Sequence, residues 1–100
     1  GSGHLSLRRE ARGRLDLDAL PEALTVRTRR GGERLRPQRA GRTRTLKALL
    51  QEAKVPAHER GAIPLLVADG RLVAVGNLWL DASVQATGAT ERRATVVWHR

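Results

Sequence analysis

Residues 65–75 read LLVADGRLVAV and carry the strongest structural signal in the sequence. Two apolar runs flank Asp69-Gly70, and this dipeptide is the preferred centre of a two-residue type I′ turn. The runs are apolar at nearly every position, which is typical of central strands that are buried on both faces. The sequence therefore predicts a β-hairpin in the middle of a sheet.

An amphipathic helix is predicted before this hairpin, over residues 45–54. Thr43 or Thr45 can supply the oxygen that caps its first turn, and Pro56 stops it. The apolar positions are spaced i, i+3, i+4 and i+7 and form one stripe that can pack on a sheet. These positions are Leu46, Leu49, Leu50 and Ala53.

An outer strand is predicted over residues 24–29, where apolar and polar residues alternate. This alternation places Leu24, Val26 and Thr28 on the inward face. A turn follows at Arg30-Gly31-Gly32-Glu33, because paired glycines adopt the positive φ angles of tight turns. Residues 34–42 are expected to form a basic loop.

Three further strands are expected near the two ends of the chain. Residues 94–99 form a last strand, and residues 5–7 and 15–17 show a weaker alternation that is compatible with a hairpin turning near Gly13. Residues 57–61 are expected to form a brief helical turn. One main helix among hairpin-linked strands predicts an α+β fold, a small and largely antiparallel β-sheet or sandwich-like domain.

Composition limits the class of protein. A chain of 100 residues, 40% of them hydrophobic, suits one small domain. Gly1-Ser2-Gly3 is interpreted as an expression scar, which leaves residues 4–100 as that domain. The sequence has no Cys, and no apolar stretch approaches the roughly 20 residues of a membrane span. We therefore expect a cytoplasmic protein with no membrane partner.

The sequence contains no constellation typical of a catalytic or metal site. Its three His are isolated and no Cys is present, so we expect no metal ligands. There is no GxSxG elbow, Walker A loop or GxGxxG motif. Asp69, Asp81 and Glu91 are scattered in turn and loop contexts, where solvated carboxylates are expected. Catalysis by this chain alone is not predicted.

The net charge of +9 is concentrated in residues 27–47. This segment holds nine basic residues against Glu33, a balance of +8, whereas the rest of the chain holds ten basic and nine acidic residues. A solvated surface would intersperse both signs, so the segment predicts a polyanionic partner. The candidate contact residues are this segment's cations and one further lysine: Arg27, Arg29, Arg30, Arg34, Arg36, Arg39, Arg42, Arg44, Lys47 and Lys54.

The residue types favour phosphate as the group that is bound. Arginine, which dominates the segment, can grip a phosphate through two parallel hydrogen bonds. The only aromatic residues are Trp79 and Trp98, both expected in or near the core, so base stacking is not the expected mode. We predict contact with the backbone of a structured duplex such as an RNA stem.

Two local details have alternative interpretations. Gly31-Gly32 next to Arg30 could cradle a phosphate, although a simple turn explains the pair as well. Arg60 is either a structural ion-pair partner or an outlying phosphate contact. In the predicted helix, Arg44, Lys47, Gln51 and Lys54 are expected to share one face, apart from the apolar stripe.

Several short motifs lie in a distinctive order between Val26 and Trp79. In chain order they are RTRRGGE (27–33), GR (41–42), LKALLQE (46–52), VP (55–56), Arg60, IPL (63–65), DG (69–70) and VAVG (73–76). This order resembles the C-terminal domain of bacterial tRNA(Ile)-lysidine synthetase. The basic positions of its motif fall on Arg27, Arg29, Arg30, Arg42 and Lys47. Asn77 stands where the pattern has a second Gly.

The resemblance implies a larger parent enzyme, an ATP-dependent ligase. In that family a separate N-terminal domain with an SGGxDS loop binds ATP, with Mg, and joins lysine to the wobble cytidine of isoleucine tRNA. The C-terminal domain helps to recognise the tRNA, chiefly at its acceptor stem. This chain lacks the SGGxDS loop, so the resemblance implies a non-catalytic part that holds no cofactor itself. Its implied partners are isoleucine tRNA and the parent's other domains, and a homodimer stays open.

Two other classes of function are compatible with parts of the sequence. A basic protein-interaction module could dock on an acidic partner surface, because arginine forks bind carboxylates as well as phosphates. A small independent enzyme is the third class, and it lacks the catalytic residues described above.

Overall fold

The computed structural model describes residues 4–100, and Gly1-Ser2-Gly3 lie outside the described residues. The predicted hairpin is present at the centre of the fold. Strands β6 (Leu65–Ala68) and β7 (Arg71–Val75) pair antiparallel. Asp69 and Gly70 between them have φ angles of 50° and 80°, both positive as a type I′ turn requires.

The hairpin forms the middle of a four-stranded antiparallel sheet with the order β3-β6-β7-β8. Its outer strands are β3 (Leu24–Arg27) and β8 (Trp79–Leu80). All four residues of β6 are buried, and so is the part of β7 that follows Arg71. The prediction of strands that are covered on both faces is confirmed.

A second sheet is built from both ends of the chain. It has the order β1-β9-β2 and contains β1 (His4–Arg9), β2 (Leu15–Asp16) and β9 (Arg93–His99). The predicted pairing of β1 with β2 is wrong, because the seven-residue β9 lies between them and pairs with both. Short 3-10 helices η1 (Leu17–Ala19) and η2 (Ala82–Val84) follow β2 and β8.

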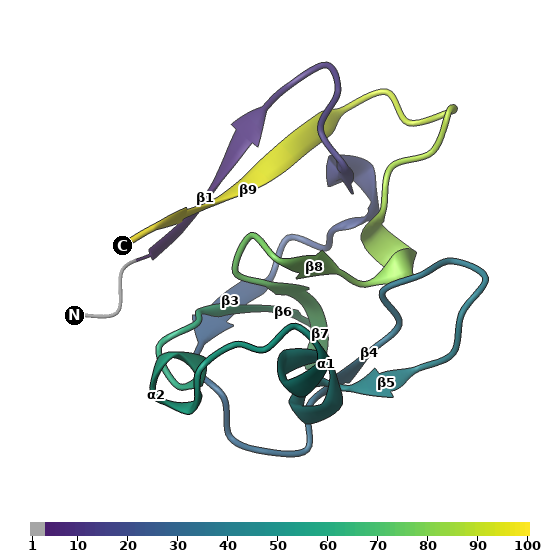
Figure 1. Ribbon diagram of the computed structural model, residues 1–100. Coiled ribbons are helices and arrows are strands. Elements are labelled where there is room, and N and C mark those ends of the chain that lie inside the picture. The colour runs from purple at the N-terminus through teal and green to yellow at the C-terminus, as the bar shows by residue number, and fades with distance from the viewer. Residues whose placement is uncertain (1–3) are drawn as a thin grey trace.

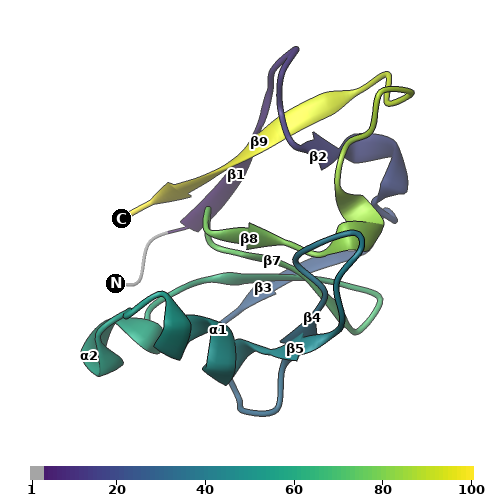
Figure 2. The same ribbon diagram turned by 45° about the vertical axis from the view of Figure 1, so that its right-hand side comes forward.

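The third layer holds the helices and a two-stranded ribbon. Its elements are α1 (Leu46–Glu52), α2 (Ala57–Arg60), β4 (Arg34–Leu35) and β5 (Arg44–Thr45). In Figures 1 and 2 this layer lies below the four-stranded sheet, and the β1-β9-β2 sheet lies above it. The α+β, largely antiparallel fold that the sequence predicts is confirmed. No helix in residues 4–100 is long and apolar enough to cross a membrane.

Two hydrophobic clusters hold the three layers together. One joins the two sheets and includes Leu15 of β2, Leu66 of β6 and Val96 of β9. The other joins the opposite face of the central sheet to the third layer and includes Leu50 of α1 and Leu65 of β6. The central sheet therefore buries both of its faces, which explains its continuous apolar sequence.

The predicted inward face of β3 is wrong. Leu24 is 37% exposed and Val26 is 50% exposed, and Thr28 lies beyond the end of the strand and is exposed. The reason is the place of β3 at the edge of the sheet, where it pairs only with β6 and contributes to neither cluster. Alternation correctly predicted a strand here but not which of its faces is covered.

Helix α1 is shorter than predicted because its C-terminus closes two residues early. Lys54 adopts a positive φ of 57°, its N–H donates to the carbonyl of Gln51, and the N–H of Val55 donates to that of Leu50. This pair of bonds is a Schellman motif. At the other end, the Thr45 hydroxyl accepts from Ala48 N, so Thr45 is the N-cap.

Candidate nucleic-acid interface

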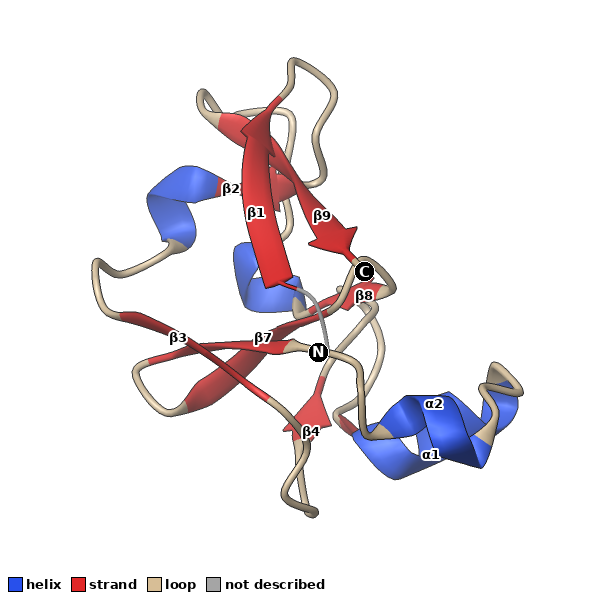
Figure 3. Cartoon of the chain, turned by 90° about the vertical axis from the view of Figure 1, so that its left-hand side faces the viewer, coloured by secondary structure: helices blue, strands red, loops and turns tan. Residues whose placement is uncertain are grey.

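The basic segment 27–47 forms the β4–β5 ribbon of the third layer, the loops on either side of β4, and the first residues of α1. It runs from the end of β3 through a connecting loop to β4, then through residues 36–43 to β5 and into α1 (Figure 2); Figure 3 shows β3, β4 and α1 from another side. Arg34 pairs with Thr45 across the ribbon, and Leu46 N donates to the Glu33 carbonyl at 2.9 Å. Because Arg34 and Leu35 form a strand, the predicted basic loop is confirmed only from residue 36 onward.

Glu33, the one acid of the segment, is enclosed by the segment's own donors. Its side chain is 4% exposed and pairs with Nη1 of Arg27 at 2.8 Å. The backbone N–H groups of Arg30 and Gly31 donate to the same carboxylate at 2.7 Å and 3.0 Å. Gly31 and Gly32 have φ angles of 100° and 82°, so the predicted turn is present. The amides of Arg30 and Gly31, which were candidates to cradle a phosphate, hold this carboxylate instead.

The hydrogen bonds around Glu33 fix its charge. Burial alone would raise the pKa of this carboxyl, but the bonds from Arg27 and from backbone N–H groups outweigh burial and lower the pKa from 4.5 to about 2. The carboxylate is therefore ionised at neutral pH and shapes the turn as a fixed internal anion. The sequence offered one signal for this role, an isolated acid immediately after two glycines in an otherwise basic run.

Asp81 anchors the loop of residues 36–43 to the central sheet. Its Oδ1 accepts from Arg36 N at 2.7 Å, and its Oδ2 accepts from the N–H and hydroxyl of Ser83. The carbonyl of Arg36 accepts from Ala82 N at 2.7 Å. Burial would raise the pKa of Asp81, but these hydrogen bonds leave its pKa lowered.

The expectation that Asp81 is solvated is therefore wrong, since its residue is only 7% exposed. Its position caps η2, and the Asp-x-Ser spacing is typical of such a turn. That spacing is the signal that could have identified the anchor from sequence.

Besides the arginine that pairs with Glu33, three of the predicted contact residues are engaged by the protein itself. Arg44 forms an ion pair with Glu52 at the far end of α1. Nη1 of Arg36 donates to the carbonyl of Arg39, and Nη2 of Arg39 donates to the carbonyl of Gln85 at 3.1 Å. These side chains stiffen the segment, although Arg39 remains exposed.

Five other predicted contact residues are exposed cations. Within residues 4–100 none of them forms an ion pair with an acidic side chain. They are Arg30, Arg34, Arg42, Lys47 and Lys54. Because they belong to one folded layer and have no carboxylate of their own, they present an uncompensated positive surface to solvent.

Arg29 is in a different state from these five. Its residue is half-buried, and its Nε is buried with no hydrogen-bond partner among the described residues. A buried donor without a partner is unusual in folded proteins.

The predicted shared helix face of Arg44, Lys47 and Lys54 is wrong. Arg44 lies in β5, before the helix begins, and Lys54 lies beyond its end in a left-handed conformation. Only Lys47 belongs to α1. The predicted helix ran past Glu52 because no Gly marks its end. Lys54 occupies the C-terminal capping position that Gly usually takes.

The remaining open details are structural. Trp79 and Trp98 are half-buried and pack against the cluster under α1, as expected. Nε of Arg60 donates to the carbonyl of Val55 at 2.8 Å, which ties α2 to the end of α1. No group of side chains that could hold a metal ion occurs in the described part of the chain.

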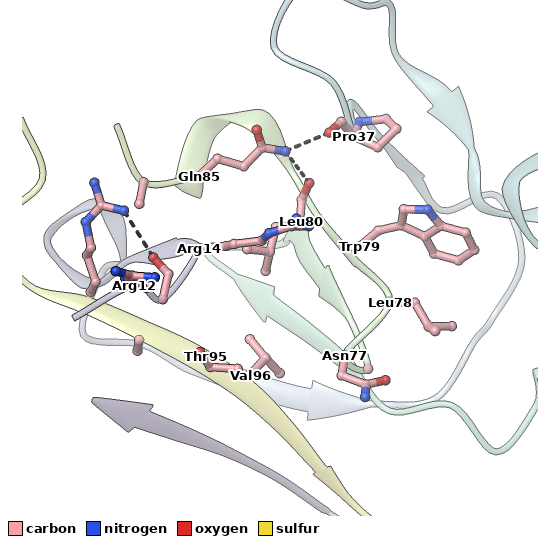
Figure 4. A pocket seen from close by; sticks show the side chains of 15 residues that line it. Arg12, Arg14, Pro37, Asn77, Leu78, Trp79, Leu80, Gln85, Thr95 and Val96 are labelled. Carbon is pink, nitrogen blue, oxygen red and sulfur yellow. Dashed lines mark hydrogen bonds between the residues drawn. The ribbon is translucent and has the colours of Figure 1, made fainter. Parts of the chain in front are cut away.

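Sequence reasoning overlooked Arg12 and Arg14, which lie in the electrically balanced part of the chain. Both line a cavity between the two sheets, close to Gln85 and to Pro37 of the basic loop (Figure 4). No spacing pattern connects these arginines with residues 27–47, because only the fold brings the two regions together.

Residues 24–98 match the family described as the TilS substrate C-terminal domain. This chain belongs to that family. The matched span of the TilS C-terminal domain begins at β3 and ends within β9. A crystal structure of a TilS C-terminal domain matches with a TM-score of 0.72 and 30% identity, covering 99% of this chain and 78% of that one. Strands β1 and β2 thus extend the family's matched span within a shared fold.

Curated relatives agree with this assignment. A tRNA(Ile)-lysidine synthase from Symbiobacterium thermophilum is 38% identical over 86 residues, which are 86% of this chain and 18% of the relative. One from Ralstonia nicotianae is 41% identical over 75 residues, or 75% of this chain and 16% of the relative. The chain therefore spans less than a fifth of the length of these two relatives.

Proposed function

We propose that this TilS C-terminal domain binds tRNA and serves a tRNA(Ile)-lysidine synthase, the ligase whose name its curated relatives carry. In this proposal the domain performs no chemistry. Other domains of the same cytoplasmic enzyme bind ATP and Mg and join lysine to the wobble cytidine of isoleucine tRNA. The domain holds the tRNA backbone at the acceptor stem.

The observation that carries the proposal is the set of exposed cations that lack acidic partners. Arg30, Arg34, Arg42, Lys47 and Lys54 all belong to the third layer or its immediate continuation. Surface charges of one sign repel each other, and a polyanion that neutralises them removes this cost. The internal ion pairs around them keep the layer rigid without neutralising these five residues.

Phosphate readout fits this surface better than base stacking. Both tryptophans pack against the core, so neither offers a free platform for a base. A duplex presents its phosphates at regular spacing, and separate arginine forks on one layer can each contact one. In this proposal three arginines keep the surface in shape and do not contact RNA: Arg27, Arg36 and Arg44. Arg39 both supports the surface and contacts a phosphate.

The proposal is tested by measuring how salt changes the affinity for an isoleucine tRNA transcript. Each neutralised phosphate lowers log K by about 0.7–0.9 per unit of log salt, so four or five contacts give a slope of about −3 to −4.5. We expect a slope in that range. A flat dependence, or binding to an acidic polypeptide such as polyglutamate without binding to tRNA, would contradict the proposal.

A further inference from the structure

A cavity of about 610 Å³ lies between the β1-β9-β2 sheet and the edge strand β8. Its walls come from five separate regions: the loop before β2, Pro37, residues 76–80, Gln85, and strand β9 (Figure 4). The volume falls within the range of small-ligand sites, roughly 300–1,000 Å³, and is too small for a nucleic-acid duplex.

Arginines line one end of this cavity. Arg12 and Arg14 are exposed and have no ion-pair partner in the part of the chain that the structure describes. Arg93 also lines the cavity, but its guanidinium donates to the carbonyls of Gly13 and Thr87. Arg12 and Arg14 are therefore the groups available to an anion, and Arg93 fixes the loop that carries them.

The rest of the lining is suited to a flat, partly polar ring. Leu78, Leu80 and Val96 give apolar surface, and Leu78 is 43% exposed although it is a large hydrophobic residue. Gln85 offers a fixed polar group, because its Nε2 donates to the carbonyls of Pro37 and Leu80 at 2.7 Å and 2.9 Å. Both of its donor hydrogens are then used, which leaves Oε1 as an acceptor. Figure 4 shows Gln85 held in this way.

The cavity is continuous with the basic surface. Pro37, in the loop that joins β4 to β5, forms part of its wall. Arg39 of the same loop donates to the carbonyl of Gln85, whose side chain lines the cavity. Residues 36–43 contain no acid, so an RNA strand that follows this loop from the third layer to the cavity meets no acidic residue of the loop.

We propose that this cavity binds one unpaired nucleotide of an RNA strand whose paired part lies on the third layer. Arg12 and Arg14 contact its phosphate, the apolar wall covers one face of its base, and Gln85 accepts a hydrogen bond from the base edge. The site rests on the proposed function but involves different residues from those assigned to the duplex. Arg12 and Arg14 also lie outside the span that matches the family.

The test uses two RNA hairpins with the same stem, one blunt and one with a single-stranded 3′ extension. We compare the wild type, the double variant Arg12→Gln/Arg14→Gln, and the control Arg8→Gln/Arg9→Gln, which removes the same charge from exposed positions of β1. The extension should raise affinity roughly fivefold or more for the wild type and the control, because it adds a phosphate contact and buries one face of a base on apolar surface. The double variant should gain no affinity from the extension. For the blunt hairpin, it should lose no more affinity than the control variant does.

Other outcomes separate the two proposals. If the blunt hairpin binds and the extension adds nothing, the cavity assignment is wrong and the duplex surface stands. If neither hairpin binds, both proposals fail. The cavity could also take a free nucleotide, which offers the same phosphate and base. Titration with adenosine 5′-monophosphate, followed through the indole NMR signal of Trp79 in the cavity wall, tests this alternative. A shift there without any effect of the extension would assign the cavity to a free nucleotide and overturn the RNA-strand proposal.

Discussion

Nη1 of Arg27 lies 2.8 Å from Oε2 of Glu33, at the point where the central sheet passes into the basic layer. The pair is half-buried on the arginine side and almost fully buried on the carboxylate side. Since two backbone N–H groups share the same carboxylate, the only acid of the segment organises its first turn. The neighbouring exposed cations stay unneutralised because this acid faces inward.

Replacing Glu33 by Gln should destabilise the domain at neutral pH. The folded-state pKa of about 2 lies below the ordinary 4.5, so the ionised carboxylate contributes stability above pH 4.5 that is lost as pH falls toward 2. The shift corresponds to at most about 3 kcal/mol. Urea unfolding at pH 7 and pH 3 should show a large difference between wild type and Glu33→Gln at pH 7 and a smaller one at pH 3. Glu22→Gln, at an exposed position, is the control, and an equal loss in both variants would contradict this role for Glu33.

Replacing Lys54 by Gly should stabilise the domain. Lys54 occupies the left-handed position that closes α1, with φ 57°, where a residue with a Cβ costs roughly 1 kcal/mol relative to Gly. Thermal or urea unfolding should show a gain of up to about 1 kcal/mol for Lys54→Gly. Lys54→Ala removes the same charge and keeps the Cβ, so it should show no such gain. If both variants behave alike, charge and not backbone geometry determines the effect.

Truncation to Ala should destabilise the domain much more at Leu50 than at Val26. Leu50 is fully buried in the cluster under α1, so Leu50→Ala should cost about 2–5 kcal/mol of unfolding free energy. Val26 is half exposed on the edge strand, and Val26→Ala should cost less than about 1 kcal/mol. Chemical unfolding measures both. A large loss of unfolding free energy for Val26→Ala would show that Val26 lies on a buried face, as the sequence pattern predicts.

Gly13 should not tolerate a side chain. An added Cβ would lie 2.3 Å from the carbonyl oxygen of Ala94 in β9, a contact that only a backbone shift can relieve. Gly13→Ala should therefore cost about 1–3 kcal/mol or more. Gly88→Ala meets no atom within 4 Å and should be close to neutral in the same unfolding assay. Similar stabilities of the two variants would show that the loop before β2 does not approach Ala94 of β9 this closely.

Local sequence patterns predicted more of the fold than of the candidate site. The Asp69-Gly70 turn, the buried strands around it and the leucine stripe of α1 follow from short-range rules, and the structure has all three. The covered face of β3 and the partners of β1 depend on which strand takes the edge and on β9, which lies about 80 residues away along the chain from β2. Neither appears in a local pattern.

The candidate site divides in the same way. Local charge density identified the segment 27–47, whereas the state of each cation depends on tertiary contacts. Glu52 lies close enough to engage Arg44 only after α1 folds back beside β5, and Gln85 meets Arg39 across 46 residues of chain. For the same reason Arg12 and Arg14 join the basic loop only in the folded domain.

The most direct test of RNA binding by residues 27–47 compares two triple variants. Their affinities for an isoleucine tRNA transcript are measured at one fixed, moderate salt concentration. Arg30→Gln/Arg34→Gln/Arg42→Gln removes three exposed cations of the third layer, and Arg8→Gln/Arg9→Gln/Arg100→Gln removes the same charge from the β1-β9-β2 sheet and its C-terminal end. We expect a loss of at least about tenfold for the first variant, with a salt slope shallower by about 2–3. The second should lose less than about threefold. Equal losses for the two variants would contradict the assignment of RNA binding to residues 27–47.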